Sequence, residues 1–156
     1  MLTTATRSQR STSITSGDSE SPDIQPKPRL SIFVVFTSID WTLKALEKAG
    51  EIARPVGANI VVLAVQIVPY PLPLEKPPVS MEFLIKRFEE RVGEFPERTK
   101  ISVYLCRDPM ETFKRILSRN SPVVIGIKKR LLPTRYERLA RKLHRAGYDV
   151  ILAETE

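Results

Sequence analysis

Basic side chains gather in one short stretch that follows Gly126. An apolar run ends at this glycine, three cations (Lys128, Lys129 and Arg130) follow, and a helical pattern begins near Thr134. Cationic side chains and the free amides of a helix N-terminus are the groups that proteins use to bind phosphate and other anions. The stretch is therefore a candidate anion site. A surface for an acidic partner and a solvated face are the alternatives.

The charge of the chain is concentrated in the same region. Residues 126–147 contain eight basic residues and one acidic residue, whereas the rest of the chain has 17 of each. A local positive field of this kind favours an anionic partner, although it also serves solubility. The single acid, Glu137, follows Thr134 at capping-box spacing, and such a box would occupy two of the helix-end amides that an anion needs.

The predicted helix over residues 135–146 is itself basic. Arg135, Arg138, Lys142 and Arg145 follow one another at steps of three and four, which places them on one helix face. We expect this face to be solvated or to meet an acidic protein partner. Nucleic acid is disfavoured, because the segment has no recognition motif and no stacking aromatic residue beyond Tyr136.

Residue types that support catalysis are scarce. The only histidine, His144, lies among arginines in the sequence, and we expect it to be a surface residue. The only cysteine, Cys106, excludes an internal disulfide; it reads as a small buried side chain, with a reactive thiol beside Arg107 as the alternative. We therefore expect no enzyme, no metal and no resident cofactor, with a nucleotide or phosphate as the candidate ligand.

The composition divides the chain into two parts. Residues 1–29 are rich in Ser and Thr and poor in apolar residues, so we expect a disordered tail, with an organelle-targeting segment as the alternative. Residues 30–156 are expected to form one α/β domain. Apolar runs long enough to span a membrane are lacking, and the lone cysteine fits a reducing compartment, so a cytoplasmic protein is predicted.

Strand and helix patterns alternate through the second part. Continuous apolar runs predict strands buried on both faces, as in a parallel sheet, and periodic apolar residues predict helices between them. Pro55 and Gly57 are expected to end the first helix, and the proline-rich residues 69–78 to form a loop. The predicted strands are 30–36, 59–68, 101–106, 122–127 and 148–154, and the predicted helices are 39–54, 81–92, 109–117 and 134–146. This alternation predicts an open five-stranded parallel sheet with helices on both faces, a Rossmann-like architecture.

Several segments resemble the universal stress proteins (UspA-like family) in order and spacing. The matching segments are residues 42–46 (TLKAL), the Gly57–Ala58 pair, the strand end at Val68–Pro69, the helix start in CRDPMETFKRIL and the strand PVVIGI. The resemblance covers about residues 30–154. It implies the strand order 3-2-1-4-5, a regulatory or adaptor role in stress response, and a homodimer through the last strand, where Tyr148, Val150 and Leu152 are the candidate contacts.

The resemblance also implies a crevice between the loop of residues 37–40 and the loop of residues 128–134. Nucleotide-binding members carry an aspartate where this chain has Thr37, and a glycine where it has Lys129. Thr134 begins the last helix only eight residues after Gly126, so the rest of their glycine loop is missing. We therefore expect no ATP binding of the family's usual kind; the alternative is a sensor for a nucleotide or other small anion. Trp41 could line its pocket, or pack in the helix layer. The candidate ligand residues are Thr37, Ser38, Asp40, Val65, Gly126, Lys128, Lys129, Arg130 and Thr134.

Overall fold

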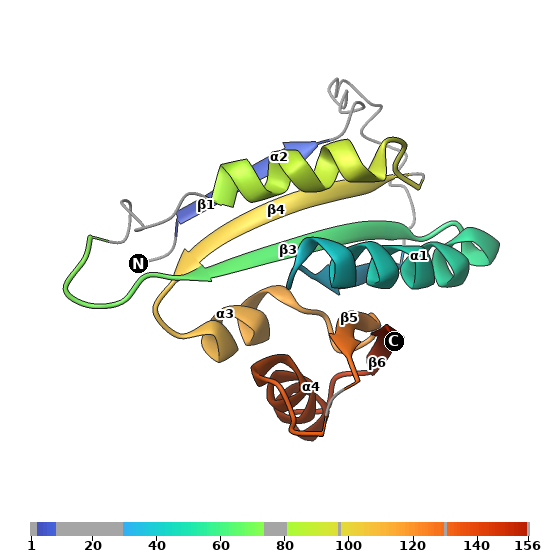
Figure 1. The fold of residues 1–156 in the computed structure, drawn as a ribbon. Coiled ribbons are helices and arrows are strands. Elements are labelled where there is room, and N and C mark those ends of the chain that lie inside the picture. The colour runs from blue at the N-terminus through green and yellow to red at the C-terminus, as the bar shows by residue number, and fades with distance from the viewer. Residues whose placement is uncertain (1–2, 9–29, 74–80, 97, 130, 156) are drawn as a thin grey trace, which may run out of the picture.

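The fold is described from a computed structural model that covers residues 3–8, 30–73, 81–96, 98–129 and 131–155. Strands and helices alternate along the chain from residue 30, as the apolar pattern predicts (Figure 1). The elements are β1 (Thr3–Ser8), β2 (Ser31–Val35), α1 (Ile39–Val56), β3 (Asn59–Ile67), α2 (Met81–Val92), β4 (Thr99–Cys106), α3 (Pro109–Ile116), β5 (Val123–Lys128), α4 (Arg135–Arg145) and β6 (Val150–Thr155).

The strands form one sheet in the order β1-β4-β3-β2-β5-β6. The five strands from β2 onward are parallel, and β2 pairs with both β3 and β5 at the centre. Counted among themselves, these five have the order 3-2-1-4-5, so the predicted open parallel sheet is confirmed. The winding direction reverses between β2 and β5. Ligands of open parallel sheets bind at the carboxyl ends of the strands beside such a reversal.

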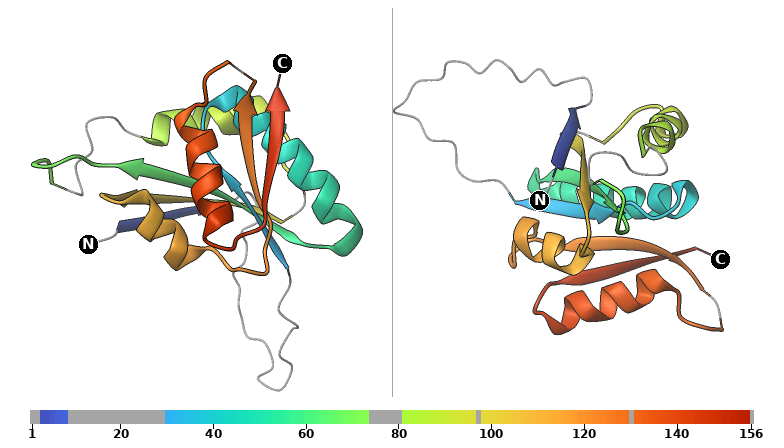
Figure 2. Two further views of the ribbon diagram at one scale, coloured as in Figure 1. Left: turned by 90° about the horizontal axis from the view of Figure 1, so that it is seen from below. Right: turned by 90° about the vertical axis from the view of Figure 1, so that its left-hand side faces the viewer.

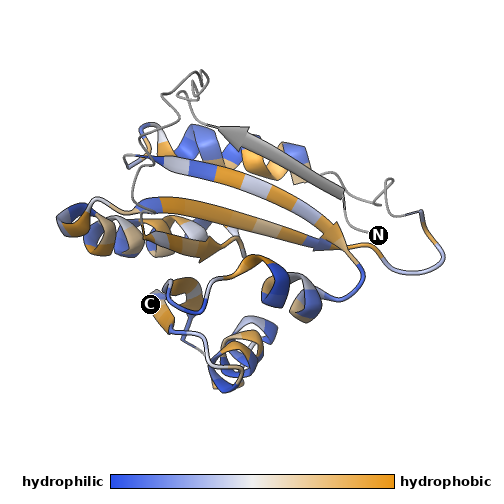
Figure 3. Ribbon diagram, turned by 180° about the vertical axis from the view of Figure 1, so that it is seen from behind, coloured by the Kyte–Doolittle hydropathy of each residue, from blue (hydrophilic) through white to orange (hydrophobic). Residues whose placement is uncertain are grey.

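The helices cover the sheet on both sides (Figure 2). One apolar core lies under α1 and α2 and contains Val34, Leu46 and Phe88, whereas a second lies under α3 and α4 and contains Phe113, Ile125 and Leu143. The strand β3 is apolar along most of its length, while β4 alternates apolar and polar residues (Figure 3). The long apolar run of β3 fits its place inside the sheet, because a strand that helices cover on both faces has apolar side chains on both faces.

Local sequence signals fix most helix ends. Ser38 caps α1, Asp108 caps α3 with Pro109 in its first turn, and Gly57 adopts a left-handed conformation (φ 65°) after α1. Such a conformation suits glycine, which has no Cβ to clash with the following carbonyl. Pro55 was expected to end α1 but lies inside its last turn, where the missing N–H removes only one terminal hydrogen bond.

The N-terminal segment differs from the expectation. Thr3–Ser8 form β1, which pairs antiparallel with β4 from Thr3 opposite Leu105 to Ser8 opposite Lys100. The predicted disordered tail is therefore wrong for these six residues, and residues 9–29 lie outside the described part. An edge strand needs backbone partners more than an apolar pattern, so a polar Thr/Ser segment can form one. With β1 in place, β4 is no longer an edge of the sheet.

A disulfide test addresses β1 directly. Opposed residues of antiparallel strands have Cα atoms about 4.5–5.5 Å apart, which is within the range of a disulfide. In a Cys106→Ala background, Ala5→Cys with Val103→Cys should oxidise within one chain, because the two positions are partners. Ala5→Cys with Lys100→Cys lies three positions out of register and should oxidise far more slowly. Equal rates for both pairs, measured by non-reducing electrophoresis, would contradict the pairing.

The last strand is shorter than expected. The sequence predicts a strand over residues 148–154, but β6 begins at Val150. Tyr148 lies before it, buried to 5% exposure in the core under α3 and α4, so it does not belong to the open edge. Val150 is half-buried and Leu152 is exposed. Only these two of the three candidate dimer contacts are on the edge strand.

Candidate functional site

The loop after β2 is held by a single buried hydroxyl. Thr42, in the first turn of α1, is fully buried, accepts a hydrogen bond from the amide of Thr37 (3.0 Å) and donates one to the carbonyl of Ser38 (2.5 Å). Ser38 accepts a hydrogen bond from the amide of Trp41 through its own side chain (3.3 Å). The loop is thereby closed on itself, and the Ser38 hydroxyl is engaged as a helix cap. Thr42 was not among the residues that the sequence singled out.

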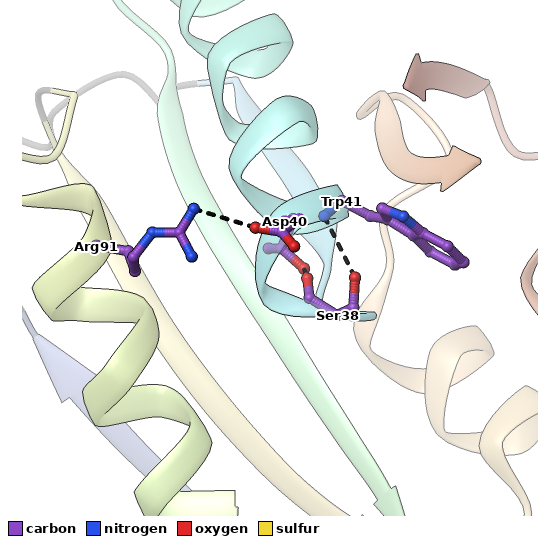
Figure 4. Close-up of polar contacts among 5 residues, drawn as sticks. Ser38, Asp40, Trp41 and Arg91 are labelled. Carbon is purple, nitrogen blue, oxygen red and sulfur yellow. Dashed lines mark hydrogen bonds and ion pairs between the residues drawn. The ribbon is translucent and has the colours of Figure 1, made fainter. Parts of the chain in front are cut away.

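Asp40 lies on the opposite side of this turn from Trp41. Its carboxylate accepts a hydrogen bond from Arg91 of α2 (3.0 Å), whereas the indole of Trp41 extends toward the other side (Figure 4). Both partners of this ion pair are largely exposed, so it contributes at most about 1 kcal/mol. Asp40 therefore links α1 to α2 and does not face α4.

The expected crevice between the two loops is bridged by aromatic side chains. The rings of Trp41, at the start of α1, and Tyr136, at the start of α4, meet edge to face with their centroids 6.2 Å apart. Arg135 donates a hydrogen bond to the Tyr136 hydroxyl (2.7 Å) and lies over its ring. Of the two roles expected for Trp41, these contacts correspond to packing between helices.

Gly126 has a packing role at the same place. A Cβ at this position would overlap the main-chain carbonyl of Trp41, so the first turn of α1 lies directly on β5. A glycine is required wherever another backbone comes this close. The close neighbour of Gly126 on this side is thus a helix of the same chain.

The helix end that follows the basic loop is closed by its own side chains. Thr134 and Glu137 make the predicted capping box, with hydrogen bonds of 3.3 Å from the Glu137 amide to the Thr134 hydroxyl and 2.8 Å from the Thr134 amide to the Glu137 carboxylate. Lys128 and Lys129 are exposed, and Arg130 lies outside the described residues. Two helix-end donors are occupied and a carboxylate stands beside them, which opposes anion binding here.

A cavity of about 510 Å³ opens instead beside the carboxyl ends of β2 and β3. Thr37 and Val65 line it, together with apolar residues from the starts of α2 and α3. The face of α4 that borders it carries Arg135, Arg138 and Lys142, and none of the described residues around it is acidic. A hollow of this volume suits a small organic molecule, and its charged wall suits an anion.

Of the eight candidate ligand residues that the structure describes, two line this cavity, Thr37 and Val65. The three cations of the cavity were visible in the sequence at helical spacing, but that spacing alone does not distinguish a solvated face from a cavity wall. Arg145, which the spacing places on the same face, lines a separate shallow hollow of about 490 Å³ between α4 and β6. Arg141 and His144 line this second hollow too.

Cys106 is a poor nucleophile in this setting. It is buried to 3% exposure, and burial raises the pKa of its thiol. The charge of Asp108 acts in the same direction, while a hydrogen bond with Thr112 partly offsets both. The guanidinium of Arg107, which could have stabilised a thiolate, donates instead to the carbonyls of Val68 and Leu72 (both 2.9 Å). The thiol is therefore protonated at neutral pH, which fits a packing role.

Metal-binding clusters and membrane-spanning helices are both lacking in the described part of the chain. His, Cys, Asp and Glu side chains nowhere gather there in a group of three or more that could hold a metal ion. Among the helices, none combines the length and apolar character that crossing a bilayer requires.

The fold and the cavity define a class of protein: an open parallel sheet with a pocket beside the point where its winding reverses. No protein-family model and no curated protein sequence matches the chain. Solved structures do. A universal stress protein from Archaeoglobus fulgidus is 18% identical with a TM-score of 0.57, covering 79% of this chain and 92% of its own. A universal stress protein in complex with cAMP is 17% identical with a TM-score of 0.54, covering 82% and 98%. The chain thus has the universal-stress-protein fold.

Proposed function

We propose that this protein is a universal-stress-protein-like regulatory or adaptor module, cytoplasmic and without catalytic activity, that does not bind ATP through a glycine loop. The position of Gly126 under the Trp41 carbonyl is the observation that carries the proposal. The carbonyl of Trp41 occupies the side of Gly126 on which a Cβ would lie, and this close packing supports the proposal. The capping box of α4 and the exposed Lys128 and Lys129 support the same conclusion.

A thermal-shift and calorimetric titration tests this function. A ligand that binds only the native state raises its stability once the ligand concentration exceeds Kd. Mg-ATP, AMP and inorganic phosphate at millimolar concentration are expected to leave the unfolding temperature unchanged. A shift with ATP that Lys128→Ala and Lys129→Ala together abolish would show that the altered loop still holds phosphates, and the proposal would be wrong.

A second candidate function is a sensor for a small anionic ligand. The cavity beside β2 and β3, with its three cations and no acidic residue among its described neighbours, favours it. A structural neighbour with the same fold is in complex with cAMP, so cAMP belongs among the probes. A shift with cAMP that survives the Lys128 and Lys129 changes but disappears in Arg138→Glu with Lys142→Glu would support a cavity sensor and leave the first proposal intact.

We also propose that two surfaces bind proteins. The first surface is the open edge of β6, which would pair with a second copy of the chain; Leu152 on this edge is 42% exposed. Leu131 and Leu132, in the loop before α4, are exposed as well. Light scattering is expected to give twice the mass of one chain, and Leu152→Lys is expected to halve it. A monomeric mass for the unchanged protein would refute this assembly. The second surface is the basic helix over residues 135–146, which would meet an acidic protein partner.

A further inference from the structure

The wall of the cavity beside β2 and β3 has two chemically different parts. Most of its described residues are apolar, among them Phe36, Met81, Met110 and Phe113. The remainder comes largely from α4, where Arg138 and Lys142 are exposed at the rim, one helical turn apart. A molecule that fills this cavity must therefore present an apolar body to the sheet and negative charge to α4.

One uncharged polar group in the wall lacks a partner. The Oγ1 atom of Thr37 is buried, and no hydrogen-bond partner for it is found among the described residues. Buried hydroxyls are nearly always hydrogen-bonded, and leaving one unpaired is costly. Thr37 lines the cavity, so a single polar atom of a bound molecule could satisfy it.

The polarity of the wall also distinguishes between classes of organic anion. Besides the cations, the described polar side chains around the cavity are Thr37, Gln66 and Tyr136, and the Tyr136 hydroxyl already accepts a hydrogen bond from Arg135. A nucleotide has many polar atoms on its base and sugar, and each would lose its water on entering. A hydrocarbon or aromatic body loses nothing and gains from burial.

We propose that the cavity is a binding site for an amphiphilic organic anion, in which an apolar chain or ring carries one acidic head group. The apolar body lies against the carboxyl ends of β2 and β3, and the head group meets Arg138 and Lys142. This inference rests on the second candidate function, a sensor in the cavity, and specifies its ligand. Carboxylate and sulfonate head groups share the required chemistry.

The test uses the full-length protein and the fluorescent probe 8-anilinonaphthalene-1-sulfonate, which has an aromatic body and an anionic head. The probe is titrated first, and decanoate, decanol, inorganic phosphate and cAMP are then used as competitors. Decanoate is expected to displace the probe at a concentration at least tenfold lower than decanol, and phosphate is expected not to displace it. If decanol equals decanoate, the head group has no role and the proposal is overturned.

Two matched double variants locate the site. Arg138→Glu with Lys142→Glu changes the cavity wall, whereas Arg141→Glu with Arg145→Glu makes the same change of charge on the same helix at positions that line the second hollow instead. The first pair is expected to weaken the binding of probe and decanoate at least tenfold, and the second pair less than threefold. Equal weakening would show a general effect of charge and would overturn the proposal.

All four positions are exposed, and circular dichroism at increasing temperature checks that both variants fold. Should the first pair fail to fold, Arg138→Gln with Lys142→Gln replaces it, with an expected loss of at least threefold. The result with cAMP distinguishes this inference about the ligand from the sensor function on which it rests. If cAMP competes and decanoate does not, with the same dependence on Arg138 and Lys142, the sensor stands and the amphiphilic ligand is wrong.

Discussion

Replacing Gly126 by alanine is expected to destabilise the protein by about 3 kcal/mol, near the upper end of what an overpacked core costs. The added Cβ would overlap the carbonyl group of Trp41. This neighbour is helix backbone, which cannot rotate away as a side chain could. Relief requires α1 to shift away from β5, and such a shift would also separate the Trp41 and Tyr136 rings.

Urea unfolding measures this effect, and Gly50→Ala supplies the control. Gly50 lies within α1, where a Cβ would sit 3.6 Å from the nearest atom of Pro96, an ordinary contact. Alanine is favoured over glycine in a helix by up to about 1 kcal/mol, so this variant is expected to be neutral or more stable. A Gly126→Ala protein as stable as the unchanged chain would show that β5 and α1 are not in close contact, and Gly126 would again be available to a ligand.

Replacing Thr42 by valine is expected to cost about 1–3 kcal/mol, because the shape of the side chain is kept while a buried donor loses its partner. The Thr42 hydroxyl is the acceptor for the Thr37 amide. The Ser38 carbonyl keeps a second bond, since the Thr42 amide also donates to it (2.9 Å). Thr42→Val therefore leaves the Thr37 amide without its acceptor and loosens the loop that forms one wall of the cavity.

Amide hydrogen exchange distinguishes this effect from a simple loss of packing. Thr42→Val should remove the protection of the Thr37 amide, whereas Thr42→Ser keeps the hydroxyl and should keep that protection, even though it loses a buried methyl group. If the Thr37 amide exchanges equally slowly in both variants, the hydroxyl does not organise this loop.

The sequence predicts the sheet well because its signals are local. The parallel strands other than β4 are apolar runs between polar turns, and the caps Ser38, Asp108 and Thr134 lie where the helix patterns begin. The order of the strands could not be obtained from these patterns and came with the resemblance. The strand β1 was missed because a polar edge strand depends on backbone hydrogen bonds to β4, which leave no periodic trace in the side chains.

The candidate site was predicted less well for a different reason. The resemblance places Gly126 at the first glycine of a phosphate loop, but the sequence does not say whether a ligand or a helix approaches it. Asp40 was expected in the crevice, yet its partner is Arg91, which is 51 residues away in sequence. The cavity is lined by residues from five elements, β2, β3, α2, α3 and α4, near the carboxyl ends of the two strands. Arg138 and Lys142 line the cavity only because these elements lie side by side in the folded chain.

We propose that this universal-stress-protein fold has no glycine-based phosphate site. The most direct measurement is a two-dimensional amide NMR spectrum of the full-length protein, recorded while Mg-ATP is added to millimolar concentration. The amide signals of residues 126–134 are expected not to move. Progressive, saturable shifts of those signals, centred on Gly126 and Lys129, would contradict it.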